Sequence, residues 1–210
     1  AFDKKLAELR TLYPPGVAYV NQNLFGSHDT NRIGSYIVNR GLGNFRDWGK
    51  WFQMSQPVNN PAFQVRKPNA NELQMQKLFV ALQMTYVGAP MVYYGDEVGM
   101  WGANDPDDRK PMLWPDIAYE KERALPDGKL RPEAQADEVR QDQDLRAYYK
   151  KLIGIRNAHP ALQSGSYRTL LADDAHSVFA YERRLGDDVI WVILNNSEAE
   201  RTVNLPRSGF

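Results

Sequence analysis

The spacing of apolar residues changes once along the chain, and this change limits the folds that the chain can adopt. Up to about residue 160, segments with helical spacing alternate with short apolar runs typical of strands. Beyond that point, strand-like segments follow one another and are separated by turn residues. Alternating strands and helices predict a parallel sheet, whereas successive strands predict an antiparallel one. We therefore expect an α/β part over residues 1–162 and an all-β tail over residues 163–210.

Three segments of the first part have the spacing of helices, namely residues 2–12, 69–87 and 142–157. Pro14-Pro15-Gly16 is expected to end the first, and either Asn69 or Asn71 can cap the second. The residues of the third that we expect to face inward are Leu145, Tyr148, Tyr149, Leu152 and Ile153.

The predicted strands differ between the two parts. In the first part, residues 17–25 form one strand, and residues 91–94 form a second strand that is buried on both faces. The strands predicted in the tail are Tyr167–Leu171, Val178–Arg184, Val189–Leu194 and Thr202–Leu205. Residues 39–68 and 95–140 show no period and are predicted to be loops.

Composition excludes several classes of function. Lysine plus arginine and aspartate plus glutamate are both 26, so no basic field attracts nucleic acid or an anionic membrane surface. No apolar run is long enough to cross a bilayer. The absence of cysteine excludes disulfides and thiolate nucleophiles, and no two histidines have a metal-ligand spacing. We expect a neutral ligand, and the compartment stays open.

Polar side chains follow both predicted strands of the first part. His28 and Asp29 come after one strand, while Asp105 and Arg109 lie beyond the other. Sites of parallel sheets lie at the carboxyl ends of strands, so these residues are expected at one edge. Glycoside cleavage has an oxocarbenium-like transition state, and besides its two reacting carboxyl groups a third carboxylate can bind sugar hydroxyls more strongly as charge develops. Asp29 suits that third role, with His28 donating to the same sugar.

The residues alone leave structural alternatives open. A His-Asp pair is more often a turn or a cap, and Asp105 with Arg109 is also a common loop salt bridge. Arg32 either supports Asp29 or anchors the following helix. For the remaining candidates the structural interpretation is preferred or equally good, and they are Asp96-Glu97, Trp48, Trp51, Trp101, His159 and His176.

Three longer segments, residues 23–32, 93–100 and 104–112, resemble signatures of the α-amylase superfamily of glycosidases. Ser27 before His28-Asp29, together with the Asn-Asp-Pro and Arg-Lys of the third segment, is most similar to the neopullulanase, cyclomaltodextrinase and maltogenic amylase branch. This resemblance implies the C-terminal part of a (β/α)8 TIM barrel, about strands seven and eight with their helices, followed by a partial β-sandwich domain.

The resemblance also implies roles for individual residues. Asp29 would be the catalytic carboxylate that stabilises the transition state. The implied substrate-binding residues are His28, Asp105, Arg109 and Arg32. The substrate class would be an α-glucan or a cyclodextrin. The calcium-binding positions of the family lie upstream, so no metal or cofactor is expected in this segment. Whether the full-length protein forms a homodimer is left open by the sequence.

The nucleophile and the acid of the family are missing from this sequence. The nucleophile belongs to a Gly-x-Arg-x-Asp pattern, and the nearest match here, Gly154-Ile155-Arg156-Asn157-Ala158, has alanine in the last place. The chain alone is therefore expected to be inactive. Two alternatives to a hydrolase are a transglycosylase of the same family and a relative that only binds sugar. The joint presence of His28, Asp29, Asp105 and Arg109 argues against the second alternative.

Overall fold

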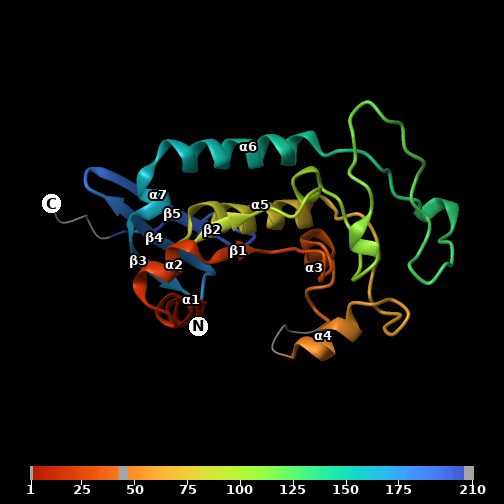
Figure 1. Ribbon diagram of the computed structural model, residues 1–210, viewed down its shortest axis with the longest axis horizontal. Helices are drawn as coiled ribbons and strands as arrows, with labels where there is room; N and C mark the ends of the chain where they lie inside the picture. Colours follow the sequence, from red (N-terminus) through yellow and green to blue (C-terminus); the bar gives the residue numbers. More distant parts are fainter. Residues whose placement is uncertain (1, 43–46, 206–210) are drawn as a thin grey trace. The chain divides into compact units, whose positions relative to one another are not determined.

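The computed structural model describes residues 2–42 and 47–205, apart from the side chain of Trp48. The chain divides into two compact units (Figure 1). Unit 1 consists of residues 1–23, 78–90 and 150–210, and unit 2 consists of residues 24–77 and 91–149. Each unit therefore contains segments that are far apart in the sequence. The predicted boundary at residue 163 stays a prediction.

Unit 1 is built around an antiparallel sheet of three strands. In order they are β3 (Ser166–Asp173), β4 (Val178–Leu185) and β5 (Asp188–Asn195), with Thr169, Tyr181 and Val192 in register across them. One face buries a core made of Phe179, Tyr181, Val192 and Leu194, against which Leu78 and Leu82 pack. The successive strands of the predicted all-β tail are thus confirmed for the first three segments.

The fourth predicted strand of the tail is wrong. Residues 201–205 have no regular secondary structure, and β5 is the last strand of the described residues. The preference of a segment for strand structure depends mostly on packing against neighbouring strands. Residues 202–205 alternate apolar and polar side chains but pair with no strand among the described residues, so they do not join the sheet.

Three short helices complete unit 1, namely α1 (Phe2–Thr11), α2 (Pro15–Val20) and α7 (Pro160–Ser164). The predicted first helix is confirmed as α1. The strand predicted over residues 17–25 is wrong in its first half, which is α2, and only β1 (Gln22–Leu24) is extended. Pro15 explains the difference, because its fixed φ and missing N–H suit the first position of a helix.

The two long predicted helices are confirmed as α5 (Ala70–Thr85) and α6 (Gln143–Ala158). Asn69 is the cap of α5: its Oδ1 accepts from the Glu72 backbone N–H at 3.0 Å, and Glu72 accepts from the Asn69 N–H at 2.8 Å. In α6 the side chains of Leu145 and Tyr149 are buried as predicted. Ile153 was expected to face inward but is 40% exposed, because it lies at the edge of the apolar stripe.

The second predicted strand of the first part is shorter and less covered than expected. The strand β2 (Ala89–Met91) pairs with β1, whereas residues 92–94 are irregular. Among the described residues β2 has no partner besides β1, so its residues are half-buried or exposed rather than covered on both faces. The assignment of these strands as numbers seven and eight of a barrel stays a prediction.

Unit 2 consists largely of loops, as the sequence indicates, with short helices among them. These helices are α3 (Ile33–Val38), α4 (Trp48–Met54) and the 3-10 turns η1 (Asp96–Val98), η2 (Asp107–Arg109) and η3 (Glu133–Gln135). The helix α4 was not predicted, and the Asp47 side chain caps it by accepting from the Lys50 N–H at 3.0 Å. Trp51 and Trp101 are buried to 2% and 3% exposure, so both pack in the interior.

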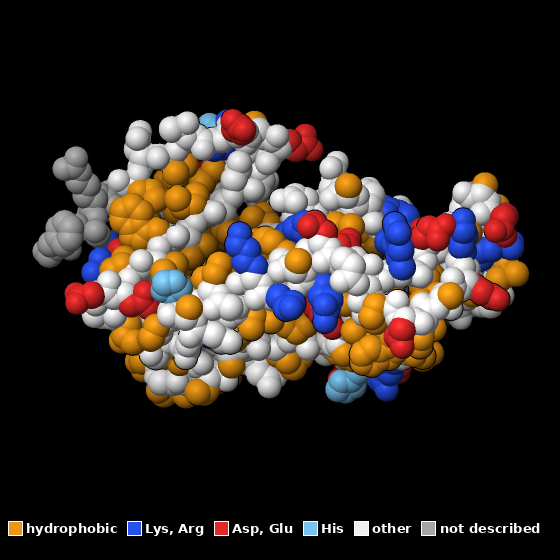
Figure 2. Space-filling view, turned by 90° about the horizontal axis from the view of Figure 1, so that it is seen from above, with side chains coloured by type: hydrophobic (Ala, Val, Ile, Leu, Met, Phe, Trp, Pro, Cys, Tyr) orange, Lys and Arg blue, Asp and Glu red, His pale blue; other side chains and the backbone are white. Residues whose placement is uncertain are grey.

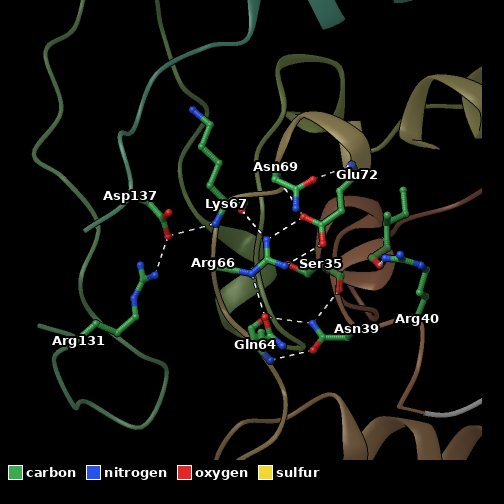
Figure 3. A network of polar contacts seen from close by, with 11 residues as sticks. Ser35, Asn39, Arg40, Gln64, Arg66, Lys67, Asn69, Glu72, Arg131 and Asp137 are labelled. Atoms are coloured by element: carbon green, nitrogen blue, oxygen red, sulfur yellow. Dashed lines mark hydrogen bonds and ion pairs between the residues drawn. The ribbon is translucent and has the colours of Figure 1, made fainter. Parts of the chain in front are cut away.

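A polar network fixes the loops of unit 2 where regular structure is missing (Figure 3). Arg66 donates two hydrogen bonds to the Glu72 carboxylate, at 2.7 and 2.8 Å. Asp137 pairs with Arg131 at 2.7 Å and accepts from the Lys67 backbone N–H at 3.1 Å. Apolar clusters lie in the same unit, one containing Phe63, Val65, Trp101 and Ala103, and another containing Val98, Met100 and Leu113.

The surface carries both signs of charge. On the face shown in Figure 2, acidic and basic side chains occur among hydrophobic ones. Within the described residues, no helix has the length and apolar character needed to cross a membrane. In the same residues, no group of three or more acidic, histidine or cysteine side chains is arranged to hold a metal ion.

Candidate active site

Four of the predicted site residues lie together in unit 2, although about eighty positions separate them in the sequence. Arg109 makes the connection: its Nε donates to the His28 carbonyl at 3.0 Å and lies 2.9 Å from Asp105 Oδ1. Its Nη2 lies 3.8 Å from Asp29 Oδ1. All four side chains are 42 to 67% exposed, so they remain available to a ligand.

A turn after β1 brings His28 and Asp29 to the same side. Adjacent side chains of a strand point to opposite faces, yet His28 Nε2 lies 3.4 Å from Asp29 Oδ1. Ser27 closes the turn, since its Oγ accepts from the Asp29 N–H at 3.2 Å and its own N–H donates to Thr30 Oγ1 at 3.1 Å. The strand β1 therefore ends before His28 and Asp29, and the turn that follows it brings the two side chains together.

A tight loop holds Asp105 and Arg109. The Asp107 carboxylate accepts from the Ala103 N–H at 2.7 Å, which closes the loop from inside. Gly102 lets the chain approach itself, because a Cβ at that position would lie 2.6 Å from the Asp107 carbonyl oxygen. The short 3-10 turn η2 then places Arg109 beside Asp105.

Arg32, the fifth predicted site residue, is buried, unlike the exposed four. Its side chain is fully buried, and Nη1 donates to Asp96 Oδ1 at 3.1 Å and to the Tyr94 carbonyl at 2.6 Å. Its guanidinium also lies over the Tyr93 ring, 4.6 Å from the ring centre. The predicted contact of Arg32 with substrate stays a prediction, as does the choice between support of Asp29 and anchoring of the following helix.

Two buried carboxyl groups, those of Asp96 and Asp108, interact electrostatically with Arg32. Burial raises the pKa of Asp96 to about 7 against the opposing effect of Arg32, and burial raises the pKa of Asp108 to about 6. Gly26 makes room for Asp96, because a Cβ there would lie 2.7 Å from Asp96 Oδ2. For Asp96 a structural role was the preferred interpretation, whereas nothing in the spacing of the sequence singles out Asp108. Gly95, with a φ of 87°, makes the sharp turn before Asp96.

The exposed cluster combines hydrogen-bond donors and acceptors that can bind a neutral polyol. Asp29 and Asp105 accept hydrogen bonds from hydroxyl groups, whereas Arg109 and His28 donate to them. The arrangement therefore suits recognition of sugar hydroxyls and stabilisation of positive charge by Asp29.

Comparison with known proteins gives consistent matches. Residues 62–165 match the family model described as the catalytic domain of alpha amylase. Neopullulanase 2 of Thermoactinomyces vulgaris is 33% identical over 210 residues, which is 99% of this chain and 27% of the relative. A cyclomaltodextrinase of a Bacillus species is 38% identical over 127 residues, covering 60% of this chain and 19% of the relative.

A solved structure supports the same relationship. A cyclomaltodextrinase structure superposes with a TM-score of 0.61 at 31% identity, over 97% of this chain and 25% of that one. The chain thus spans about a quarter or less of the length of these relatives. The neopullulanase match includes the segment of His28 and Asp29, and the family model includes Asp105 and Arg109.

The neighbours have the TIM-barrel fold of the family, and the sheet of antiparallel strands lies at the C-terminal end of this chain. Members of the family are glycosidases. The motifs that resemble this family are therefore matched along the sequence and in the structure, and the chain belongs to the α-amylase family, with neopullulanase and cyclomaltodextrinase among its relatives.

Proposed function

We propose that the protein containing this chain is a retaining glycoside hydrolase that cleaves α-1,4 glucosidic bonds, with α-1,6 bonds as a second class. Its substrates are cyclodextrins, pullulan or malto-oligosaccharides. The observation that carries the proposal is the exposed cluster in which Arg109 contacts the segment of Asp29 and His28 on one side and Asp105 on the other. The names of the relatives, neopullulanase and cyclomaltodextrinase, support the substrate class.

Each residue of the cluster has a separate role in this proposal. Asp29 stabilises the positive charge that develops at the anomeric carbon, and His28 donates a hydrogen bond to a hydroxyl group of the same sugar. Asp105 and Arg109 hold the neighbouring sugar on the non-reducing side, one accepting and the other donating hydrogen bonds. Their mutual ion pair at 2.9 Å keeps both side chains oriented before the substrate binds.

We further propose that this chain alone binds sugar without cleaving it. The reaction needs a carboxylate nucleophile and a carboxylic acid on opposite sides of the bond. The sequence contains no Gly-x-Arg-x-Asp pattern for the nucleophile. The two exposed carboxylates of the cluster have other roles in this proposal, Asp29 in charge stabilisation and Asp105 in binding.

The test compares the 210-residue chain with the full-length protein that contains it, after circular dichroism has shown that both are folded. Products from β-cyclodextrin and pullulan are separated by chromatography. We expect glucose or maltose units from the full-length protein and none from the chain. Longer oligosaccharides would indicate a transglycosylase, binding without any product would indicate a sugar-binding relative, and turnover by the chain alone would overturn the assignment of roles.

A further inference from the structure

A buried cation lies next to the candidate site but belongs to neither its exposed residues nor the apolar core. The Arg32 side chain is fully buried, three residues after Asp29. Burying a charge is costly unless it is paired and hydrogen-bonded. Asp96 and the Tyr94 carbonyl meet Nη1 of Arg32, while its Nε and Nη2 have no hydrogen-bond partner among the described residues. The rings of Tyr93 and Tyr94 also lie against the guanidinium, with ring centres 4.6 and 4.8 Å from its Cζ, so residues 93–96 supply the partners of this side chain.

The backbone of the same residue holds the loop of the second motif. The Arg32 N–H donates to the Gly102 carbonyl at 3.1 Å. The Gly102 N–H in turn donates to Ser35 Oγ at 2.9 Å, so the segment that begins at Arg32 holds Gly102 by both of its polar groups. Gly102 is three residues before Asp105. The start of the sugar-binding loop is therefore fixed to the segment that carries Asp29.

The end of that loop is linked to the Arg32 side chain through Tyr93. Asp108 is fully buried, neither of its carboxylate oxygens has a hydrogen-bond partner among the described residues, and Arg109 follows it directly. Arg109 attracts its charge, and Arg32 attracts it more weakly. Tyr93, whose ring lies beside the Arg32 guanidinium, donates from its hydroxyl to the Asp108 carbonyl at 3.5 Å. Arg32 is thus connected to both ends of the loop that carries Asp105 and Arg109, by its backbone N–H at the start and through Tyr93 at the end.

We propose that Arg32, paired with Asp96, is a positioning residue that holds the segment of His28 and Asp29 in register with the loop of Asp105 and Arg109. It acts through these residues and does not itself contact the sugar. The proposal rests on the proposed function, because it concerns the same site. Small displacements of groups that bind or stabilise a transition state lower rates strongly, so the effect should be seen in catalysis as well as in stability.

The experiment uses the full-length protein and the variants Arg32→Lys and Asp96→Asn. The second is nearly isosteric and keeps the Arg32 contact with the Tyr94 carbonyl, so it remains informative if Arg32→Lys fails to fold. With β-cyclodextrin as substrate we expect kcat/KM to fall about 10- to 100-fold in each, with a lower kcat and a higher KM. In an Arg109→Ala background, Arg32→Lys should still lower kcat but should no longer raise KM.

A matched control separates positioning from general stability. Arg183 is also fully buried and donates to the carbonyls of Thr85, Leu162 and Gly165, but it lies in unit 1. Arg183→Lys should lower the Tm and leave kcat and KM within about twofold of the wild type. An equal loss of kcat/KM in Arg183→Lys would overturn the positioning role, because any buried arginine would then do the same.

The failure of this inference differs from a failure of the proposed function. If Asp29→Asn abolishes turnover while Arg32→Lys and Asp96→Asn leave kcat and KM unchanged, the proposed function stands and the positioning role is wrong. If Asp29→Asn has no effect on turnover, both are wrong, because the cluster that Arg32 would position is not the site. A KM increase of the same size in the Arg109→Ala background also contradicts the inference.

Discussion

Arg109 is the residue through which the two segments of the candidate site contact each other. It reaches the His28 carbonyl, the Asp105 carboxylate and, at longer range, the Asp29 carboxylate. Because these side chains are about half exposed, their ion pairs add little to folding stability. The arrangement is therefore better explained by ligand binding than by stability.

Replacing Arg109 should weaken binding rather than chemistry. In the full-length protein, Arg109→Ala is expected to reduce the affinity for short malto-oligosaccharides by about 1.5–3 kcal/mol, the range for a hydrogen bond to a charged group. Isothermal titration calorimetry with maltotriose measures the change. Arg123→Ala removes an exposed ion pair with Glu133 elsewhere in the unit and serves as the control. An unchanged affinity in Arg109→Ala would remove this residue from the binding site.

Asp108 should make the stability of unit 2 depend on pH. Its pKa is raised by burial to about 6, so the folded protein holds the proton more tightly than the unfolded chain does. The free energy of unfolding should therefore decrease as the pH rises from about 4 to about 6, by at most about 3 kcal/mol. In Asp108→Asn the part of this decrease due to Asp108 should be lost, while the part due to Asp96, whose pKa burial raises to about 7, should remain. Urea unfolding of both proteins at several pH values tests this, and parallel pH profiles would contradict it.

At the scale of elements, the helices with strong periodicity and the strands β3, β4 and β5 were predictable, whereas the short strands of the first part were not. The spacing of apolar residues gave α5 and α6 with boundaries near the observed ones. The short strands β1 and β2 depend on pairing with each other, which no local pattern contains. The helix α2 was missed because Pro15 was taken as a stop signal, whereas it also opens the next helix.

The cap of α5 gives a test at this scale. Sequence left Asn69 and Asn71 as alternatives, and the structure shows Asn69 exchanging hydrogen bonds with Glu72. Asn69→Ala should lower the free energy of unfolding by about 1 kcal/mol, whereas exposed Asn71→Ala should change it by less than about 0.5 kcal/mol. Urea titrations followed by circular dichroism measure both. Equal effects of the two substitutions would show that the capping contacts do not stabilise α5.

At the scale of the whole molecule, the exposed motif residues were more predictable than the buried polar contacts next to them. That His28, Asp29, Asp105 and Arg109 come together follows from their places after two apolar runs and from the resemblance to the family. The pair of Arg32 and Asp96 was not predictable, because sixty-four positions separate the partners and neither belongs to a periodic pattern. Buried polar contacts are specific to the tertiary structure, and spacing along the chain does not encode them.

The most direct test of the central proposal is the turnover of the full-length protein with the substitution Asp29→Asn. Loss of one preorganised electrostatic group should reduce kcat on β-cyclodextrin by about 10²–10³-fold or more, while circular dichroism and Tm stay close to the wild type because the side chain is 65% exposed. A kcat within a few fold of the wild type would remove Asp29 from the mechanism and, with it, the assignment of this cluster as the active site.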